Sequence, residues 1–260
     1  MKRCMTLLLL TLSLTVLSAP CAQDSAAKPL WTLKGTEPNS KEHEFLQECL
    51  TAGRGKIEKF FSTPFVKPFV VEIFPSRAHF DDYMQARWKV PKTQSWMVAS
   101  GVSDKLVMLS RKMWKTQASE HNPGDDSHAR ELIAHELVHV YHGQHNPTGD
   151  FDGMDDLGWL VEGLAVYVSG QLDHAHRDAA KDAIQKGHAP KTLAQAWSGR
   201  YRYGVCGSMI RYIDQTKGRP TLQQLLAVIK PEQALKLLNT TEEQFLAGWI
   251  KYEESRWQKP

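Results

Sequence analysis

The feature that most constrains this chain is the run His135-Glu136-Leu137-Val138-His139. Residues four apart on an α-helix lie on one face about one turn from each other, so His135 and His139 can offer two imidazoles to a single ion. Glu136 lies about 100° further round, where a carboxylate can reach a metal-bound water without binding the metal itself. This pattern predicts a zinc hydrolase with Glu136 as general base.

The residues around the motif predict a helix. Asp125, Asp126 and Ser127 are good N-cap residues, they follow the Pro123-Gly124 break, and Gly143 can end the helix. The apolar residues between these limits fall on more than one side, as expected of a buried helix: Leu132, Ile133, Leu137, Val138 and Val140. Two buried histidines and an adjacent buried glutamate each need a polar partner, because an unpaired polar group is costly to bury. A single metal site would provide for all three side chains, so we expect a metal centre.

A hydrolytic zinc site needs a third protein ligand and an open position. His145 has the ligand spacing of the metzincins, but those enzymes require a glycine where this chain has His142. Glu162 lies in an apolar helical run, residues 159–167, where a lone carboxylate would otherwise be costly to bury. We favour Glu162. His142, within about 20° of His135 on the helical wheel, is either an alternative ligand or the partner of a ligand.

The motif at 135–139, followed by Trp159-Leu-Val-Glu-Gly-Leu-Ala-Val-Tyr167, resembles the gluzincin zinc peptidases, most closely the bacterial peptidase MA-like domains. The resemblance implies that the two histidines and Glu162 bind one zinc ion and that Glu136 activates the water. It also implies a peptide or protein substrate.

The resemblance further implies a tyrosine at the start of a later helix, opposite the metal, that stabilises the oxyanion. The run from Tyr203 to Ile213 is similar to that segment, which gives Tyr203 the role, with Tyr201 and Tyr212 as alternatives. Val166 stands where thermolysin-like enzymes carry an Asp, and no aminopeptidase exopeptidase motif precedes the zinc helix. Neither of these two subgroups is therefore expected.

The N-terminus predicts a secretory signal peptide over residues 1–22. A basic start is followed by an apolar run from Met5 to Leu17 and by small residues, and this run is too short to span a membrane. Acylation of Cys21, as in a lipoprotein, is disfavoured by Pro20 directly before it. We expect a secreted or periplasmic protein whose mature chain has no membrane span.

The net charge bears on the class of binding partner, and the cysteine count bears on disulfide bonding. Lys2 and Arg3 would be removed with the signal peptide, so the net charge of the mature chain falls from +3 to +1. A net charge this close to zero gives no reason to expect nucleic acid or an anionic membrane as a partner. Cys49 and Cys206 lie outside the signal region. They form either one disulfide in an oxidising compartment or two buried free thiols.

The rest of the chain contains strands and a few helices first, and helices only afterwards. After a mobile leader over 23–38, the N-terminal part is expected to contain a helix over 40–61, a strand over 65–74, a helix over 77–88, and a hairpin of strands over 96–100 and 105–110. After the zinc helix and a loop over 144–157, helices are expected over 159–171, 174–186, 193–197, 203–217, 221–229, from Pro231 onward, and over 243–257.

This order predicts an α+β, zincin-like peptidase domain over 39–260. It has a part with a small mixed sheet over 39–145, a helical part over 146–260, and the active-site helix at their junction, with substrate in the cleft. In zincins the strand before the active-site helix is an exposed edge that pairs with extended substrate. Residues 107–110 are therefore expected to be the peptide-binding edge, or else an ordinary covered edge.

These inferences predict a secreted zinc-dependent endopeptidase. Zinc would polarise the scissile carbonyl and lower the pKa of its water, Glu136 would move the proton to the leaving amine, and Tyr203 would hydrogen-bond the oxyanion. A second hypothesis is a non-catalytic binding protein on a peptidase fold, which the intact Glu136 disfavours. A third is a zinc hydrolase of a non-peptide amide. No motif marks the pocket residues, so the sequence predicts no side-chain preference.

Overall fold

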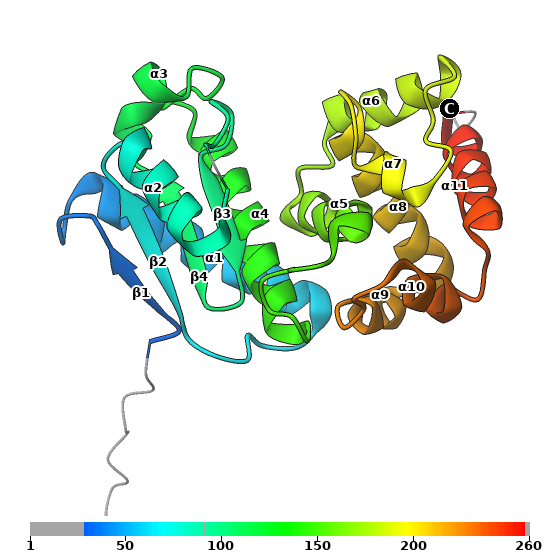
Figure 1. Ribbon diagram of the computed structural model, residues 1–260, viewed down its shortest axis with the longest axis horizontal. Coiled ribbons are helices and arrows are strands. Elements are labelled where there is room, and N and C mark those ends of the chain that lie inside the picture. The colour runs from blue at the N-terminus through cyan, green and yellow to red at the C-terminus, as the bar shows by residue number, and fades with distance from the viewer. Residues whose placement is uncertain (1–28, 91, 258–260) are drawn as a thin grey trace, which may run out of the picture.

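A small mixed sheet occupies the N-terminal half of the protein (Figure 1). The computed structural model describes residues 29–90 and 92–257, so the predicted signal peptide and Cys21 lie outside the described residues. The strands run in the order β1-β2-β4-β3: β1 (Trp31–Lys34), β2 (Phe69–Phe74), β4 (Lys105–Leu109) and β3 (Ala99–Val102). The first three are parallel, and β3 is antiparallel to β4. The expected α+β class with a small mixed sheet is confirmed.

Strand β1 lies within the segment expected to be a mobile leader, so that expectation is wrong for residues 31–34. β1 pairs in parallel with β2, and the Trp31 indole donates a hydrogen bond to Gln47 Oε1 (2.8 Å) and lies near the ring of Phe69. Four residues of alternating burial are too short a pattern to separate from a leader by sequence alone.

The predicted hairpin is present, but its order in the sheet differs from the expectation. β4 is hydrogen-bonded on both sides, to β2 and to β3, and Val107 is fully buried. Residues 107–110 are therefore not the sheet edge, and the prediction of a peptide-binding edge there was wrong. The edge strand on this side of the sheet is β3, because the hairpin inserts its second strand next to β2.

Helices cover both faces of the sheet. On one face, Phe80 and Met84 of α2 (Arg77–Trp88) pack on Val107. On the other face, Leu106 and Met108 join the main core with α1 (Lys41–Phe61) and α4 (Asp126–His145). The N-caps of α1, α2 and α4 are the side chains of Ser40, Ser76 and Asp125. Two short helices of this half, without side-chain caps, are η1 (Arg111–Met113) and α3 (Trp114–Gln117).

The C-terminal half is helical in its described part (Figure 1). Its central helix α5 (Gly158–Ser169) packs on α4 and on α8 (Arg202–Lys217), and a side chain at Gly163 would collide with the backbone of Cys206. The limits of these helices agree with the expected ones within a few residues. Around α5 lie η2 (Asp155–Leu157), α6 (His174–Gln185), α7 (Leu193–Ala196), α8 (Arg202–Lys217), α9 (Arg219–Leu225), α10 (Pro231–Leu238) and α11 (Glu242–Trp257).

The two cysteines outside the signal region, and the apolar character of the helices, can both be compared with the expectations. Cys49 and Cys206 are both buried and free, so the structure contains the two thiols rather than the disulfide. Within the described ranges, none of the helices combines the length and the apolar character needed to cross a lipid bilayer.

Candidate metal centre

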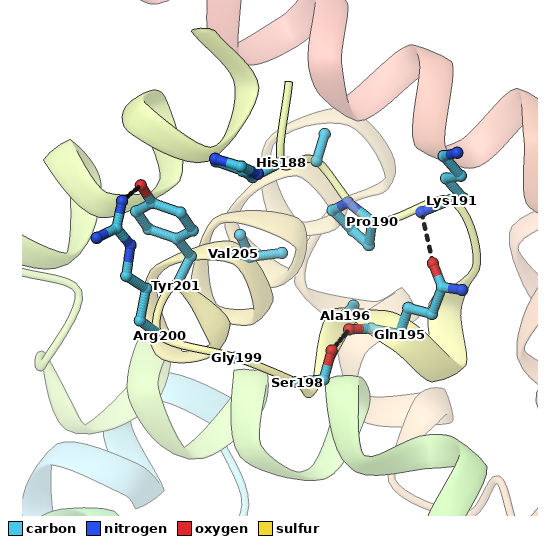
Figure 2. A pocket seen from close by; sticks show the side chains of 11 residues that line it. His188, Pro190, Lys191, Gln195, Ala196, Ser198, Gly199, Arg200, Tyr201 and Val205 are labelled. Atoms are coloured by element: carbon cyan, nitrogen blue, oxygen red, sulfur yellow. Dashed lines mark hydrogen bonds between the residues drawn. The ribbon is translucent and has the colours of Figure 1, made fainter. Parts of the chain in front are cut away.

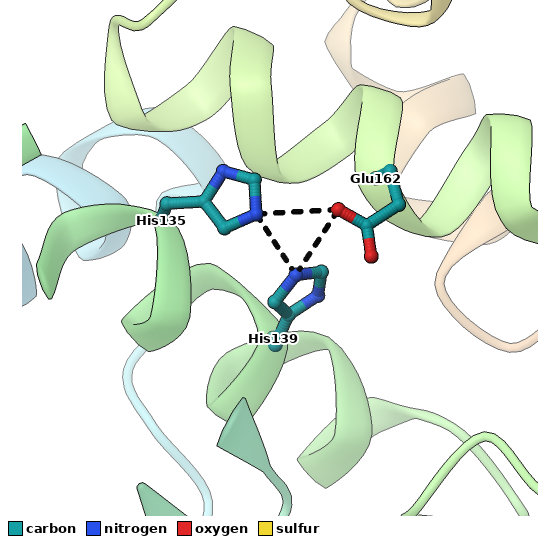
Figure 3. A group of neighbouring side chains, drawn as sticks. All are labelled: His135, His139 and Glu162. Atoms are coloured by element: carbon teal, nitrogen blue, oxygen red, sulfur yellow. Dashed lines mark hydrogen bonds and ion pairs between the residues drawn. The ribbon is translucent and has the colours of Figure 1, made fainter. Parts of the chain in front are cut away.

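Three side chains from two helices converge on one point (Figure 3). The Nε2 atoms of His135 and His139, both on α4, are 3.1 Å apart. Glu162 Oε2, on α5, lies 3.3 Å from the first and 3.6 Å from the second. Within residues 29–90 and 92–257, this is the only group of three or more His, Cys, Asp or Glu side chains close enough to hold a metal ion.

The electrostatics of this triad favour a bound cation. Burial alone would raise the pKa of the Glu162 carboxyl, but His139 and His135 more than offset burial and hold that pKa well below its usual range. Glu162 is therefore a carboxylate facing two imidazole nitrogens in a largely buried place. Two imidazole nitrogens and one carboxylate oxygen are a donor set that suits a divalent transition metal.

Glu136 lies beside the triad, one residue after His135 and on another side of α4. Its side chain is buried, and burial raises the pKa of its carboxyl to about 7. The pKa of about 7 also includes the downward effect of His135, the upward effect of the Glu162 charge and the downward effect of the Gly101 backbone N–H. A carboxyl with a pKa near neutrality can both accept and release a proton at physiological pH, which is what a general base requires.

The edge strand β3 crosses directly over α4. A Cβ built on Gly101 would lie 2.3 Å from the backbone oxygen of Glu136, so only a glycine permits this approach. Val98 O accepts a hydrogen bond from Leu109 N, and this antiparallel register turns the backbone groups of Ala99 and Gly101 outward, away from β4. A stretch of sheet edge that no other strand pairs therefore runs beside Glu136, and the Gly101 N–H already hydrogen-bonds that carboxyl.

The loop that leads into β3 is held in place by Arg77. Its guanidinium lies in the loop's interior and donates hydrogen bonds to Thr93 Oγ1 and to the backbone oxygens of Gln94, Ser95, Met97 and Gln117. Each of these acceptors needs a donor, and one side chain satisfies all of them. The start of the edge strand is thereby fixed relative to α2.

Tyr203, in the first turn of α8, borders the same cavity as the triad. The cavity has a volume of about 620 Å³ and is lined by His135, Glu136, His139, Glu162 and Tyr203 among others. Burial, and secondarily the charge of Glu162, raise the pKa of the Tyr203 hydroxyl, while Arg202 lowers it. The hydroxyl therefore stays protonated and can donate a hydrogen bond into the cavity.

The alternative tyrosines lie elsewhere. Tyr212 packs against Phe245 and Tyr252 in the helical half. Tyr201 borders a separate groove of about 660 Å³, where its hydroxyl accepts a hydrogen bond from Arg200 and His188 stacks near its ring (Figure 2). Neither the triad nor Glu136 lines that groove. Of the three tyrosines, the structure places only Tyr203 beside the triad.

The other two histidines of the second half of α4 are not part of the triad. His145 Nδ1 lies 2.9 Å from the backbone oxygen of Tyr141, one turn earlier, and the centroids of the two rings lie 4.3 Å apart with the ring planes at an angle of 34°. His142 is fully buried against Phe151, and burial lowers its pKa to about 3. Of the two candidates for the third ligand, the structure brings Glu162 and not His145 to the histidine pair.

Two neighbours of the site were not singled out by the sequence. Gln171 Oε1 lies 2.7 Å from His135 Nδ1. The guanidinium of Arg202 lies 5.0 to 5.2 Å from the ring centroids of Trp96, Trp197 and Tyr203, and so links the loop before β3 to the helical half. No spacing in the sequence marks either residue, because both act through contacts between distant parts of the chain.

Comparison of the chain with protein-family models, with curated proteins and with solved structures found no significant match. The case for a function therefore depends on the geometry of the site.

Proposed function

We propose that this protein is a zinc-dependent metallopeptidase of the gluzincin type. The observation that carries the proposal is the convergence of His135, His139 and Glu162 beside Glu136, a carboxyl whose pKa is raised to about 7. Two imidazoles and a carboxylate are the protein ligands of one class of catalytic zinc site. The arrangement of the four side chains, more than any single motif, supports the assignment.

His135, His139 and Glu162 would hold one zinc ion. When bound, zinc lowers the pKa of a water molecule and polarises the carbonyl of the bond to be broken. Two side chains would carry out the proton transfer and stabilise the oxyanion. The Glu136 carboxylate accepts a proton from the attacking water at one oxygen and returns it to the nitrogen of the leaving amine. The Tyr203 hydroxyl donates a hydrogen bond to the oxygen on which negative charge develops.

The sheet edge supports a peptide as substrate. The outward N–H and C=O of Ala99 and the outward C=O of Gly101 can pair with an extended chain as an additional strand, which holds a peptide without regard to its sequence. A non-peptide amide would leave this edge unused. The position of α4 under an antiparallel edge strand also supports the finer assignment of a zincin-like fold, and the signal-like N-terminus supports action outside the cytoplasm.

A binding protein without catalysis is the alternative from another class. Glu136 argues against it, because a buried carboxyl beside the triad costs free energy that binding alone does not require. Turnover that depends on Glu136 separates the two hypotheses.

The test is metal analysis and peptide cleavage with the chain from residue 23 to 260. We expect about one zinc per chain in the parent and much less in His139→Ala. Glu136→Gln should retain zinc and cleave an unstructured protein substrate at least about 10²-fold more slowly. Glu44→Gln, on the exposed side of α1, is the matched control and should cleave like the parent. Equal cleavage by Glu136→Gln and the parent would rule out the proposed role of Glu136.

A further inference from the structure

The ring of His135 is held by a hydrogen bond on the side away from the triad. Its Nδ1 lies 2.7 Å from Gln171 Oε1, and the residue is 7 % exposed. An amide oxygen can only accept, so Nδ1 must carry the proton, and the neutral ring then has its lone pair on Nε2. Nε2 is the ring nitrogen left for the triad, and it lies 3.3 Å from Glu162 Oε2 and 3.1 Å from His139 Nε2.

The chain places Gln171 through the end of α5. Gly170 follows the last residue of this helix with a φ of +93°, a left-handed conformation that other residues rarely adopt. The turn is tied down because Ser169 Oγ accepts a hydrogen bond from Gln171 N (3.3 Å) and Lys56 Nζ donates one to Ser169 O (2.5 Å). The helix that carries Glu162 therefore also presents Gln171 to His135.

The two histidines of the triad differ in whether their Nδ1 atoms have a hydrogen-bond partner. His139 Nδ1 is buried, and no hydrogen-bond partner for it is found among the described residues. One turn after Glu162, α5 carries Val166, which is fully buried in the core and offers no side-chain hydrogen bond. Gln171 is thus the side chain of the α5 segment that orients a ring of the triad, and it orients His135 alone.

We propose that Gln171 is a positioning residue for metal binding, which fixes both the tautomer and the rotation of His135 so that Nε2 points at the metal position. The inference rests on the proposed metal site, and it adds a residue that no motif in the chain identifies. Hydrogen-bond partners of metal ligands typically change metal affinity about 10- to 100-fold when they are removed. The amide acts on the side of the ring away from the metal position, so its effect must pass through His135.

Three variants separate the hydrogen bond from simple packing. Gln171→Leu keeps much of the volume and removes the acceptor, whereas Gln171→Glu keeps an acceptor oxygen. Gln185→Leu, at the exposed end of α6, is the matched control for replacing a glutamine by leucine. Circular dichroism confirms that each variant is folded.

The first measurement is zinc affinity by competition with a chelator, which needs no cleavage assay. We expect Gln171→Leu to bind zinc about 10- to 100-fold more weakly than the parent, and Gln171→Glu and Gln185→Leu to bind at least as tightly as the parent. Unchanged affinity in Gln171→Leu would overturn the proposal. Equal losses in Gln171→Leu and Gln171→Glu would also overturn it, because packing would then explain both.

The second measurement is the tautomer of His135 in the metal-free protein, read from the nitrogen NMR chemical shifts of its ring. We expect the Nδ1–H tautomer in the parent and in Gln171→Glu, and a mixture in Gln171→Leu. A single Nδ1–H tautomer in Gln171→Leu would refute the role of Gln171. This result is independent of catalysis: a parent that binds no zinc contradicts the proposed function, and the ring shifts still decide whether Gln171 orients His135.

Discussion

Replacing Gly101 by alanine should damage both the stability and the site, because β3 and α4 touch at this residue. The added Cβ would lie 2.3 Å from the backbone oxygen of Glu136 and 3.2 Å from His139 Cβ. Ordinary van der Waals contact begins near 3.4 Å, so strand and helix must separate by about 1 Å. Neither neighbour is the flexible end of a side chain. Overpacking of this kind typically costs about 1–3 kcal/mol of unfolding free energy.

The same displacement should slow catalysis, since a shift of about 1 Å in a catalytic group can cost about 10²-fold in rate. The assay is urea unfolding of the metal-free protein, followed by cleavage with zinc present. Gly55→Ala is the control: Gly55 lies in α1, nothing lies within 4 Å of the position that a Cβ would take there, and alanine should stabilise the helix by up to about 1 kcal/mol. An unfolding free energy of Gly101→Ala within about 0.5 kcal/mol of the parent would refute the reasoning.

Three further predictions concern side chains that hold the scaffold together. Arg77→Met should lower the unfolding free energy by about 2–3 kcal/mol in urea, because the loop before β3 loses its shared donor; a loss below about 0.5 kcal/mol would show that the loop does not depend on it. Arg211→Met should cost about 3–5 kcal/mol by leaving Glu253 buried without its partner at 2.6 Å, and adding Glu253→Gln should recover much of the loss; no recovery would contradict this explanation. Burial and Asp214 raise the pKa of Tyr167 to about 12 from an ordinary value of 10.0, so its protonated form is favoured by folding. The parent should therefore lose stability relative to Tyr167→Phe as the pH rises from about 10 to about 12, and parallel curves would exclude that coupling.

The sequence predicted the parts of the site that local chemistry determines. Helix α4 was expected from its caps and motif, and the structure has it at Asp126–His145 with the side chain of Asp125 as N-cap. Glu162 was chosen over His145 because a lone carboxylate in an apolar helix needs a partner, and the structure brings it to the histidine pair. Both inferences needed only neighbours along the chain.

The features that the sequence did not predict depend on distant contacts. Strand order cannot be read from alternation, since β4 looks the same whether it is an edge or an interior strand, and only pairing with β2 decides. Gln171 meets His135 across 36 positions, after a left-handed turn at Gly170 that sets its direction. An ordinary glutamine after a helix carries no signal of such a contact.

The short edge strand also bears on self-association. An unpaired edge is a template on which a second copy of a chain can add its own strand and begin to aggregate. β3 has only four residues, and the N–H of Ser103, just beyond it, is already bonded to the oxygen of Gly149. The backbone groups that no other strand pairs are the N–H and C=O of Ala99 and the C=O of Gly101, so the free edge offers only a few hydrogen bonds. The shortness of β3 therefore limits how far a second copy could extend the sheet at this edge.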